Sequence, residues 1–336
     1  MSIACTLIPS PEHVIAGHPE NPERFAYLER LPQAGLTGEI EWLEPEPVQE
    51  SELNLVHSPA LLAFLKDAIR QAPAIIDHAP TYVAPGSWQA ALRAAGGTLA
   101  CTRAVLDNRA RSAFALVRPP GHHAEADRAM GFCLLNNLAI ATQAALQAGL
   151  QRVLIVDYDA HHGNGTQDIF LHNERVTFIS LHQGDIYPGT GSLSDAPHAR
   201  GRILNAPLPA YAGDQAFARL TAEVIRPLAE RLRPEMIFVS AGFDAHWSDP
   251  LTNLGVSTTG FFQISQALVG LAQALCAGRI VFVLEGGYDP QRLEQNTRAV
   301  LGAMAGAAQV DDPEGPSPYP EPDISGLIHQ LRENHL

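Results

Sequence analysis

Cysteine is scarce in this chain, and the few cysteines lie far apart. The 336 residues include four of them, Cys5, Cys101, Cys133 and Cys276, and no two form a CxxC pair. This spacing argues against both a disulfide framework and a zinc site built from cysteines. We therefore expect four buried thiols.

Long apolar runs and an excess of basic residues are also absent. The longest apolar stretches have the length of a strand, well short of a membrane span. Residues 1–10 lack the basic start and the long apolar centre of a signal peptide. These absences predict a cytoplasmic protein without a membrane partner. The net charge of −14 argues against nucleic acid as a partner and fits a substrate that carries positive charge.

The residues that are present fit a large α/β protein. With 46% hydrophobic and 17% charged residues, the chain can bury a large core. Strand-like runs at 113–117, 153–156, 176–181, 236–240 and 280–284 alternate with helical stretches at 87–106, 134–148, 215–232 and 260–277. This alternation predicts a three-layer α/β/α architecture with a mostly parallel sheet. We expect a single domain over residues 1–336, with a proline-rich segment and a short helix at 311–336 packed on it.

Each expected strand is followed by residues capable of chemistry. These segments are 118–125, 157–165, 182–191, 241–246 and 285–288. The carboxyl ends of parallel strands share one edge of a sheet, and ligands usually bind there. Long ordered loops on a rigid sheet often build such sites. We therefore expect the five segments to form one site.

The run DYDAHHGNG at residues 157–165 predicts a metal site. Asp159 and His161 are two residues apart, and alternate residues of an extended segment point the same way. Asp244 would add a third ligand from another strand end. Two oxygens and one nitrogen, with room for water, are typical of a catalytic zinc site, in which the metal lowers the pKa of water and polarises a carbonyl.

An open metal site also needs a base and a donor for the developing oxyanion. The adjacent His122 and His123 suit proton transfer near neutral pH, and the hydroxyl of Tyr288, which follows two glycines, can donate to an oxyanion. Asp157 is either a buried structural carboxylate or a group that orients His122 or helps bind a monovalent cation. These parts together predict a hydrolase for an amide or a similar carbonyl.

Taken together, these motifs resemble the histone deacetylase superfamily, which includes acetylpolyamine amidohydrolases and acetoin-utilisation proteins. RPPGHHAE, MGFCLLNN, DYDAHHGNGT, SAGFDAH and EGGY occur in the family's order, and the match runs from residue 18 to residue 288. The class II-like bacterial histone deacetylase-like amidohydrolases are the most similar branch. The resemblance implies an arginase/deacetylase-like fold and a zinc-dependent deacetylase that releases acetate and a free amine.

The resemblance also implies roles for individual residues. One zinc ion would be held by Asp159, His161 and Asp244. His123 would act as general base and then acid, with His122 as its electrostatic partner and Tyr288 as the oxyanion donor. Asp157 would hold His122. Asn164 would stand behind His123 where some members have an aspartate. Because an amide lacks the negative charge of an aspartate, His123 should be less basic than the same histidine in those members.

A cation and a channel are implied by the same comparison. Potassium would bind near the zinc through the side chains of Asp157 and Ser180 and the backbone carbonyls of Asp159, His161 and Leu181. A narrow channel for an aliphatic chain would be lined by Gly131, Phe132, Tyr187 and Leu251. Arg24 matches an arginine beside an inner cavity through which acetate leaves. The sequence determines no oligomeric state.

Three alternatives remain. A two-metal ureohydrolase of the arginase type would need an aspartate where Gly163 stands and a second aspartate where His246 stands. Because only one residue of this pair, His246, could still bind a metal, one zinc is favoured. We expect His246 to lie beside the channel or to support the site from behind the ligands. A catalytically inactive module that binds acyl-lysine is disfavoured because every expected ligand is present. An acetylpolyamine amidohydrolase would be expected to carry an acidic residue at the channel rim, where this chain has Leu251, so N-acetyl-lysine in proteins or peptides is favoured.

Overall fold

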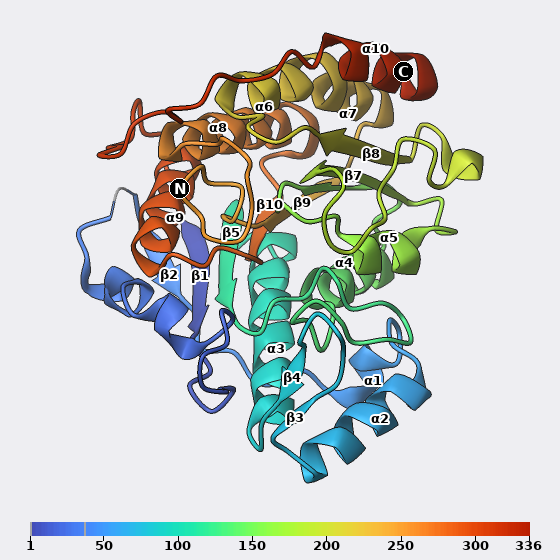
Figure 1. Cartoon of the computed structure of the whole chain (residues 1–336), viewed down its shortest axis with the longest axis vertical. Helices are drawn as coiled ribbons and strands as arrows, with labels where there is room; N and C mark the ends of the chain where they lie inside the picture. The colour runs from blue at the N-terminus through green and yellow to red at the C-terminus, as the bar shows by residue number, and fades with distance from the viewer. Residues whose placement is uncertain (1, 37) are drawn as a thin grey trace.

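The centre of the protein is an eight-stranded sheet in which every neighbouring pair of strands is parallel (Figure 1). The computed structural model describes residues 2–36 and 38–336, so residues 1 and 37 of the expected domain lie outside the description. In spatial order the strands are β2 (Ile40–Trp42), β1 (Ile3–Ile8), β5 (Ser112–Val117), β10 (Ile280–Leu284), β9 (Met236–Ala241), β6 (Val153–Asp157), β7 (Val176–Gln183) and β8 (Ile203–Leu208). A separate hairpin pairs β3 (Ala74–Ile75) with β4 (Tyr82–Val83).

Helices cover both faces of the sheet, which confirms the predicted three-layer α/β fold (Figure 1). One face carries α6 (Asp214–Leu220), α7 (Arg226–Leu232), α8 (Thr258–Cys276), α9 (Pro290–Met304) and α10 (Ser325–His335). The other carries α1 (Glu50–Leu53), α2 (Pro59–Arg70), α3 (Ser87–Leu106), α4 (Asn137–Gln147) and α5 (Asn164–Phe170). Short 3₁₀ turns lie at Pro22–Phe25, Leu28–Gln33 and Pro197–Ala199.

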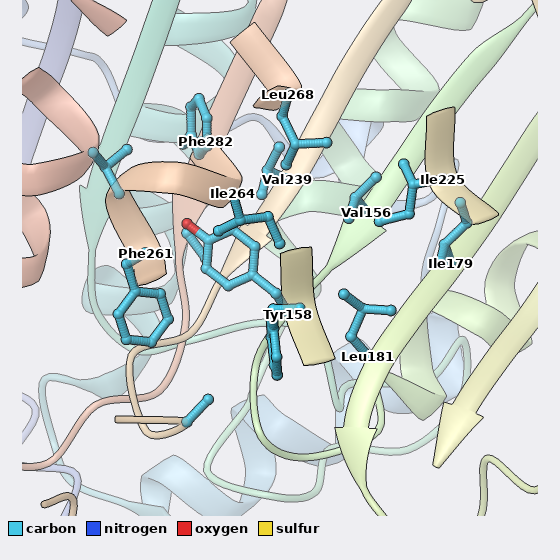
Figure 2. Packing of buried hydrophobic residues seen from close by; sticks show 14 of the residues in the cluster. Val156, Tyr158, Ile179, Leu181, Ile225, Val239, Phe261, Ile264, Leu268 and Phe282 are labelled. Atoms are coloured by element: carbon cyan, nitrogen blue, oxygen red, sulfur yellow. The ribbon is translucent and has the colours of Figure 1, made fainter. Parts of the chain in front are cut away.

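The two cores follow from the alternation of side chains along each strand. In β5, Phe114 packs in the core beneath α8 and α9, whereas its neighbour Ala115 packs in the core beneath α3 and α4. Figure 2 shows the first of these cores, where Val156, Val239 and Phe282 from three strands meet helix side chains such as Leu268 of α8. Both faces of the central strands are therefore buried, as parallel sheets require.

Helix boundaries differ from the sequence predictions where capping side chains set them. The helix expected over 134–148 begins at Asn137 because the side chain of Asn136 accepts from the backbone N–H of Ala139. The helix expected over 215–232 is α6, a wide π-type turn over Thr221–Ile225, and α7. Pro227 in α7 has no backbone N–H to donate to the preceding turn, which is consistent with this wider winding.

The segment at 311–322 has no helix or strand but is bonded to the body of the protein. Asp312 accepts from the backbone N–H of Thr259 (2.9 Å), and Glu321 accepts from three backbone N–H groups around the start of α6. The helix α10 buries Ile328 and Leu331 in the core beside α6 and α7. No helix among residues 2–36 and 38–336 is long and apolar enough to cross a membrane.

Candidate metal centre and active site

The expected metal ligands come from two strands that lie side by side only in the folded sheet. Asp159 and His161 follow β6, and Asp244 follows β9. These strands are neighbours, with Asp157 opposite Ser240 in the register. The register brings together residues that are more than 80 positions apart in the chain.

The three ligand groups converge on one point. One ligand atom from each of Asp159, His161 and Asp244 lies within 4.8 Å of the others. The Nδ1 atom of His161 is 2.9 Å from Asp244 Oδ2 and 3.2 Å from Asp159 Oδ1. Burial alone would lower the pKa of His161, but the two carboxylates raise it to about 10. Two buried carboxylates that share one imidazole favour a cation, and this donor set fits a divalent metal such as zinc.

Backbone groups hold the two carboxylates, and glycines make room for them. Asp159 Oδ2 accepts from the N–H of Gly286 (2.8 Å), and Asp244 Oδ1 accepts from the N–H of Ala160 (2.9 Å). A Cβ atom added to Gly242 would lie 2.0 Å from Asp159 Oδ2, and one added to Gly286 would lie 2.5 Å from Asp244 Oδ2. The ligand geometry therefore depends on missing side chains as well as on the ligands.

The structure leaves little room for a side chain at Gly163. A Cβ atom at this position would lie 2.1 Å from Asp157 Oδ2, so the aspartate that a two-metal ureohydrolase would need could stand here only if Asp157 moved. Among the described residues, the Asp-His-Asp group is the one cluster found with three or more possible ligands. Both observations favour a single metal.

The two adjacent histidines have different electrostatic surroundings. His122 Nδ1–H donates to Asp157 Oδ2 (3.0 Å); burial opposes the charge, but Asp159 and Asp157 raise the pKa of His122 to about 10. His123 packs 4.0 Å from His122, ring centre to ring centre, and its Nδ1 lies 2.7 Å from Asn164 Oδ1. Burial and the charge of His122 hold the pKa of His123 well below its usual range. Of the two, His122 is the one whose surroundings favour the protonated form, and His123 is the one whose surroundings favour the neutral form.

Tyr288 lines the same cavity as His123 and His161 and packs against a buried arginine. The guanidinium of Arg24 lies 4.8 Å from the centre of the Tyr288 ring and donates to the carbonyls of Gly287 (2.7 Å) and Glu285 (2.6 Å). Burial raises the pKa of the Tyr288 hydroxyl well above its usual value, so it remains a donor. Arg24 is itself buried, and its expected place beside an acetate cavity stays a prediction.

A cavity of about 210 Å³ leads to these groups. It is lined by Ala79, His123, Gly131, Phe132, His161, Tyr187, Leu251 and Tyr288. All four residues expected in the channel therefore line it. Gly131 adopts a φ of +57°, and a Cβ there would lie 2.3 Å from the ring of His123, so glycine is required where the cavity passes His123.

The residues expected to bind potassium are brought close to the metal centre. Ser180 on β7 is opposite Asp157 on β6, and Leu181 follows it. The Ser180 hydroxyl lies 2.9 Å from His182 Nδ1, and Asp157 Oδ1 accepts from the N–H of Asp159 (3.1 Å). These groups supply oxygen atoms of the kind that a hard cation prefers, while the ion itself stays a prediction.

Other histidines lie away from the metal centre. His246 is not beside the channel: its ring stacks on Trp247 and Phe261, and Nδ1 is within 3.0 Å of the Ser248 hydroxyl. His162 bonds to Thr190 (2.8 Å) and Gln167 through its two ring nitrogens. Neither ring belongs to the metal cluster.

Two acidic residues that the sequence interpretation left without a role also touch the site. Asp249 Oδ2 accepts from the backbone N–H of Tyr288 (2.8 Å). Glu125 Oε1 accepts from Asn164 Nδ2 (2.8 Å). Both residues stand in motifs, Asp-Pro after SAGFDAH and the last position of RPPGHHAE, but only the folded loops reveal their contacts.

Comparisons with known proteins find similar sequences and a similar fold. The histone deacetylase domain model matches residues 18–304. A probable deacetylase of Archaeoglobus fulgidus is 39% identical over 86% of this chain and 82% of its own length. The histone deacetylase-like amidohydrolase of Pseudomonas aeruginosa is 37% identical over 89% of this chain and 80% of its own. The crystal structure of the HDA15 HD domain superposes with a TM-score of 0.85 at 33% identity, covering 99% of this chain and 92% of that one.

Proposed function

The chain belongs to the histone deacetylase family, and from this premise we propose that it is a zinc-dependent deacetylase that hydrolyses N-acetyl-lysine in proteins or peptides. Residues 1–336 would act as one catalytic domain with one zinc ion. The observation that carries the proposal is that the cavity is lined by His123, Tyr288 and His161, and that His161 shares its imidazole with the two buried carboxylates of Asp159 and Asp244.

The metal would be held by Asp159, His161 and Asp244. When bound there, it would supply Lewis acidity that lowers the pKa of a water molecule and polarises the acyl carbonyl. The chain's own groups would handle the protons. His123 donates through Nδ1–H to Asn164 Oδ1, so its Nε2 can accept the proton of the attacking water and later give it to the leaving amine.

His122 and Tyr288 would support this proton transfer. The positive charge of His122 favours the neutral form of His123 before reaction, so the base is available at neutral pH. The hydroxyl of Tyr288 would donate to the carbonyl oxygen as negative charge develops on it. Acetate and a free amine would be the products.

The channel favours a lysine side chain over a polyamine. Phe132 and Tyr187 are aromatic walls that suit an aliphatic chain, and the rim residue Leu251, which is 42% exposed, offers no charge to a secondary ammonium. Comparing kcat/KM for an acetyl-lysine peptide and for acetylspermidine tests this preference. A strong preference for acetylspermidine would replace the proposed substrate by an acetylpolyamine.

Turnover and metal content together test the proposal. We expect one zinc per chain by elemental analysis and acetate release that is lost in Asp244→Ala and Tyr288→Phe. Arg70→Gln, a change at an exposed side chain far from the cavity, is the matched control. Zinc-loaded protein that hydrolyses no acyl-amine would favour a binding module, and two tightly bound ions per chain would favour the ureohydrolase chemistry.

Two further features belong to this proposal. Potassium would bind through Asp157, Ser180 and nearby carbonyls, and a change in activity when potassium replaces a larger cation such as tetramethylammonium would test it. The cytoplasm is the proposed compartment, in keeping with four free, buried cysteines.

A further inference from the structure

Glu125, Asn164 and His123 form a chain of hydrogen-bonded side chains behind the proposed base. Asn164 Nδ2 lies 2.8 Å from Glu125 Oε1, and Asn164 Oδ1 lies 2.7 Å from His123 Nδ1. Asn164 is buried, Glu125 is 18% exposed, and His123 lines the cavity. The chain thus runs from near the surface to the reacting side of the site.

The contact between Glu125 and Asn164 decides which end of the Asn164 amide faces His123. An ionised carboxylate can only accept hydrogen bonds, so the group that Asn164 turns toward Glu125 must be its NH₂. The carbonyl oxygen of the same amide then faces His123 and can only accept. His123 must therefore carry a proton on Nδ1, and in the neutral ring this leaves Nε2 unprotonated.

The opposite orientation of the amide would disable the base. If Asn164 turned its NH₂ toward His123, the imidazole would have to accept at Nδ1 and carry its proton on Nε2. A histidine in that tautomer cannot take a proton from water through Nε2. The second contact of Asn164 Nδ2, Met130 Sδ at 3.4 Å, is a weak acceptor and gives little preference between the orientations.

We propose that Glu125 is a positioning residue that fixes the amide of Asn164 and thereby holds His123 in the tautomer that its catalytic task requires. Position 164 carries an amide in place of the aspartate of some family members. The carboxylate is instead that of Glu125, which contacts the His123 imidazole through the side chain of Asn164. This inference rests on the proposed role of His123 as the general base.

Glu125 is well placed to keep this orientation. Its backbone N–H donates to the carbonyl of Arg128 (2.9 Å), a bond that does not depend on the Arg128 side chain. The guanidinium of Arg128, which is largely exposed, also donates to the two carboxylate oxygens at 2.9 and 3.1 Å, and such a surface pair contributes little. The carbonyl of Glu125 is 3.0 Å from His57 Nδ1. A Cβ atom on Gly165 would lie 2.3 Å from the carbonyl oxygen of Ala124, so this loop and the start of α5 are packed closely.

Two substitutions at the same position separate hydrogen bonding from charge. Glu125→Gln removes the charge but keeps an oxygen that can accept from Asn164 Nδ2. Arg128 donates toward the same oxygen position, which favours the orientation of Gln with its oxygen there. Glu125→Met has a similar length and no good acceptor. Arg128→Met is the matched control because it removes the surface partner of Glu125 and leaves the contact with Asn164 in place.

The direct measurement is the ¹⁵N spectrum of the histidine rings, since protonated and unprotonated ring nitrogens have well separated shifts. The His123 signals can be assigned among the 14 histidines by their loss in His123→Ala. We expect protonated Nδ1 and unprotonated Nε2 in the wild type, in Glu125→Gln and in Arg128→Met. Glu125→Met should show a mixture of tautomers and a kcat that is lower by roughly 10- to 100-fold, with KM and zinc content unchanged.

The outcomes are distinguishable from those that test the proposed function. An unchanged tautomer in Glu125→Met would overturn the positioning role even if the protein is an active deacetylase. Equal losses in Glu125→Gln and Glu125→Met would also overturn it, because the charge and not the acceptor would then matter. If the wild type hydrolysed no acyl-amine, the deacetylase proposal would fail while the spectra still reported whether Glu125 sets the tautomer.

Discussion

Replacing Gly286 by alanine should weaken zinc binding without removing any ligand. The added Cβ would lie 2.5 Å from Asp244 Oδ2 and 2.7 Å from Asp159 Oδ2, between the two carboxylates that the metal needs. The backbone at Gly286 lies outside the left-handed region, so alanine causes no conformational strain there. The effect of the substitution is therefore steric and confined to the ligands.

The size of the effect follows from these distances. A Cβ atom and a carboxylate oxygen do not come closer than 3.0 Å, so the carboxylate must move by roughly half an ångström. Metal–ligand distances vary by only about 0.2 Å. Displacing one of three ligands in this way should weaken zinc binding by roughly 10- to 100-fold. This loss corresponds to about 1.4 to 2.7 kcal/mol of binding free energy.

Competition with a chromophoric chelator at fixed pH measures the zinc Kd of both proteins. Gly302→Ala is the matched control, since its Cβ would lie 3.7 Å or more from any neighbour. Thermal unfolding of the zinc-free proteins shows whether Gly286→Ala still folds. A Gly286→Ala protein with wild-type zinc affinity and wild-type turnover would refute the assignment of Asp159 and Asp244 as ligands of a shared metal.

Three further predictions concern the oxyanion donor, acid stability and substrate choice. Tyr288→Phe should lower kcat by roughly 10²- to 10³-fold with little change in Tm, because the ring still packs over Arg24 and only the donor is lost; a kcat within twofold of wild type would exclude this role. His57 needs its neutral form, since Nε2 accepts from the N–H of Asn136 (2.9 Å), and burial lowers its pKa from 6.5 to about 4. Between pH 4 and 6.5 the unfolded state therefore binds more protons than the folded state. The contribution of His57 to the free energy of unfolding, on the order of 3 kcal/mol, should be present above pH 6.5 and lost as the pH falls toward 4. Urea unfolding across this range should show a smaller fall of the free energy of unfolding with pH in His57→Gln than in the wild type, and an equal fall in both proteins would count against this role. Leu251→Glu should raise kcat/KM for acetylspermidine relative to an acetyl-lysine peptide by about fivefold, because a rim carboxylate pairing with a secondary ammonium contributes about 1 kcal/mol; an unchanged ratio would show that the rim does not select the substrate.

The sequence was sufficient where a signal is local. Each of the five expected strands is present within two residues at either end, because its apolar run is bounded by polar or turn residues. The pair Asp159 and His161 could also be predicted, since both belong to one extended segment behind a buried strand. Strands β1, β2 and β8 of the sheet were missed, as was the β3–β4 hairpin. Strand β8 is interrupted by Asn205 and Pro207, which an edge strand tolerates and which a local pattern does not associate with a strand.

The site depended more on contacts between distant segments. The sequence offered Asp244 and His246 as candidates in the same short motif. Only the register of β6 with β9 brings Asp244 beside Asp159 and His161, while His246 packs on Trp247 and Phe261. The same holds for Glu125, whose partner Asn164 is 39 residues away.

The sequence by itself determined the α/β class, the strand ends that carry chemistry and the identity of the ligand types, because these follow from periodicity and from side-chain chemistry within a few residues. Only the tertiary structure decided which of these groups meet, which amide lies between Glu125 and His123, and how little room there is for a side chain at Gly163 and Gly286. Such features depend on distances of a few tenths of an ångström between segments far apart in the chain, and no local pattern encodes those distances.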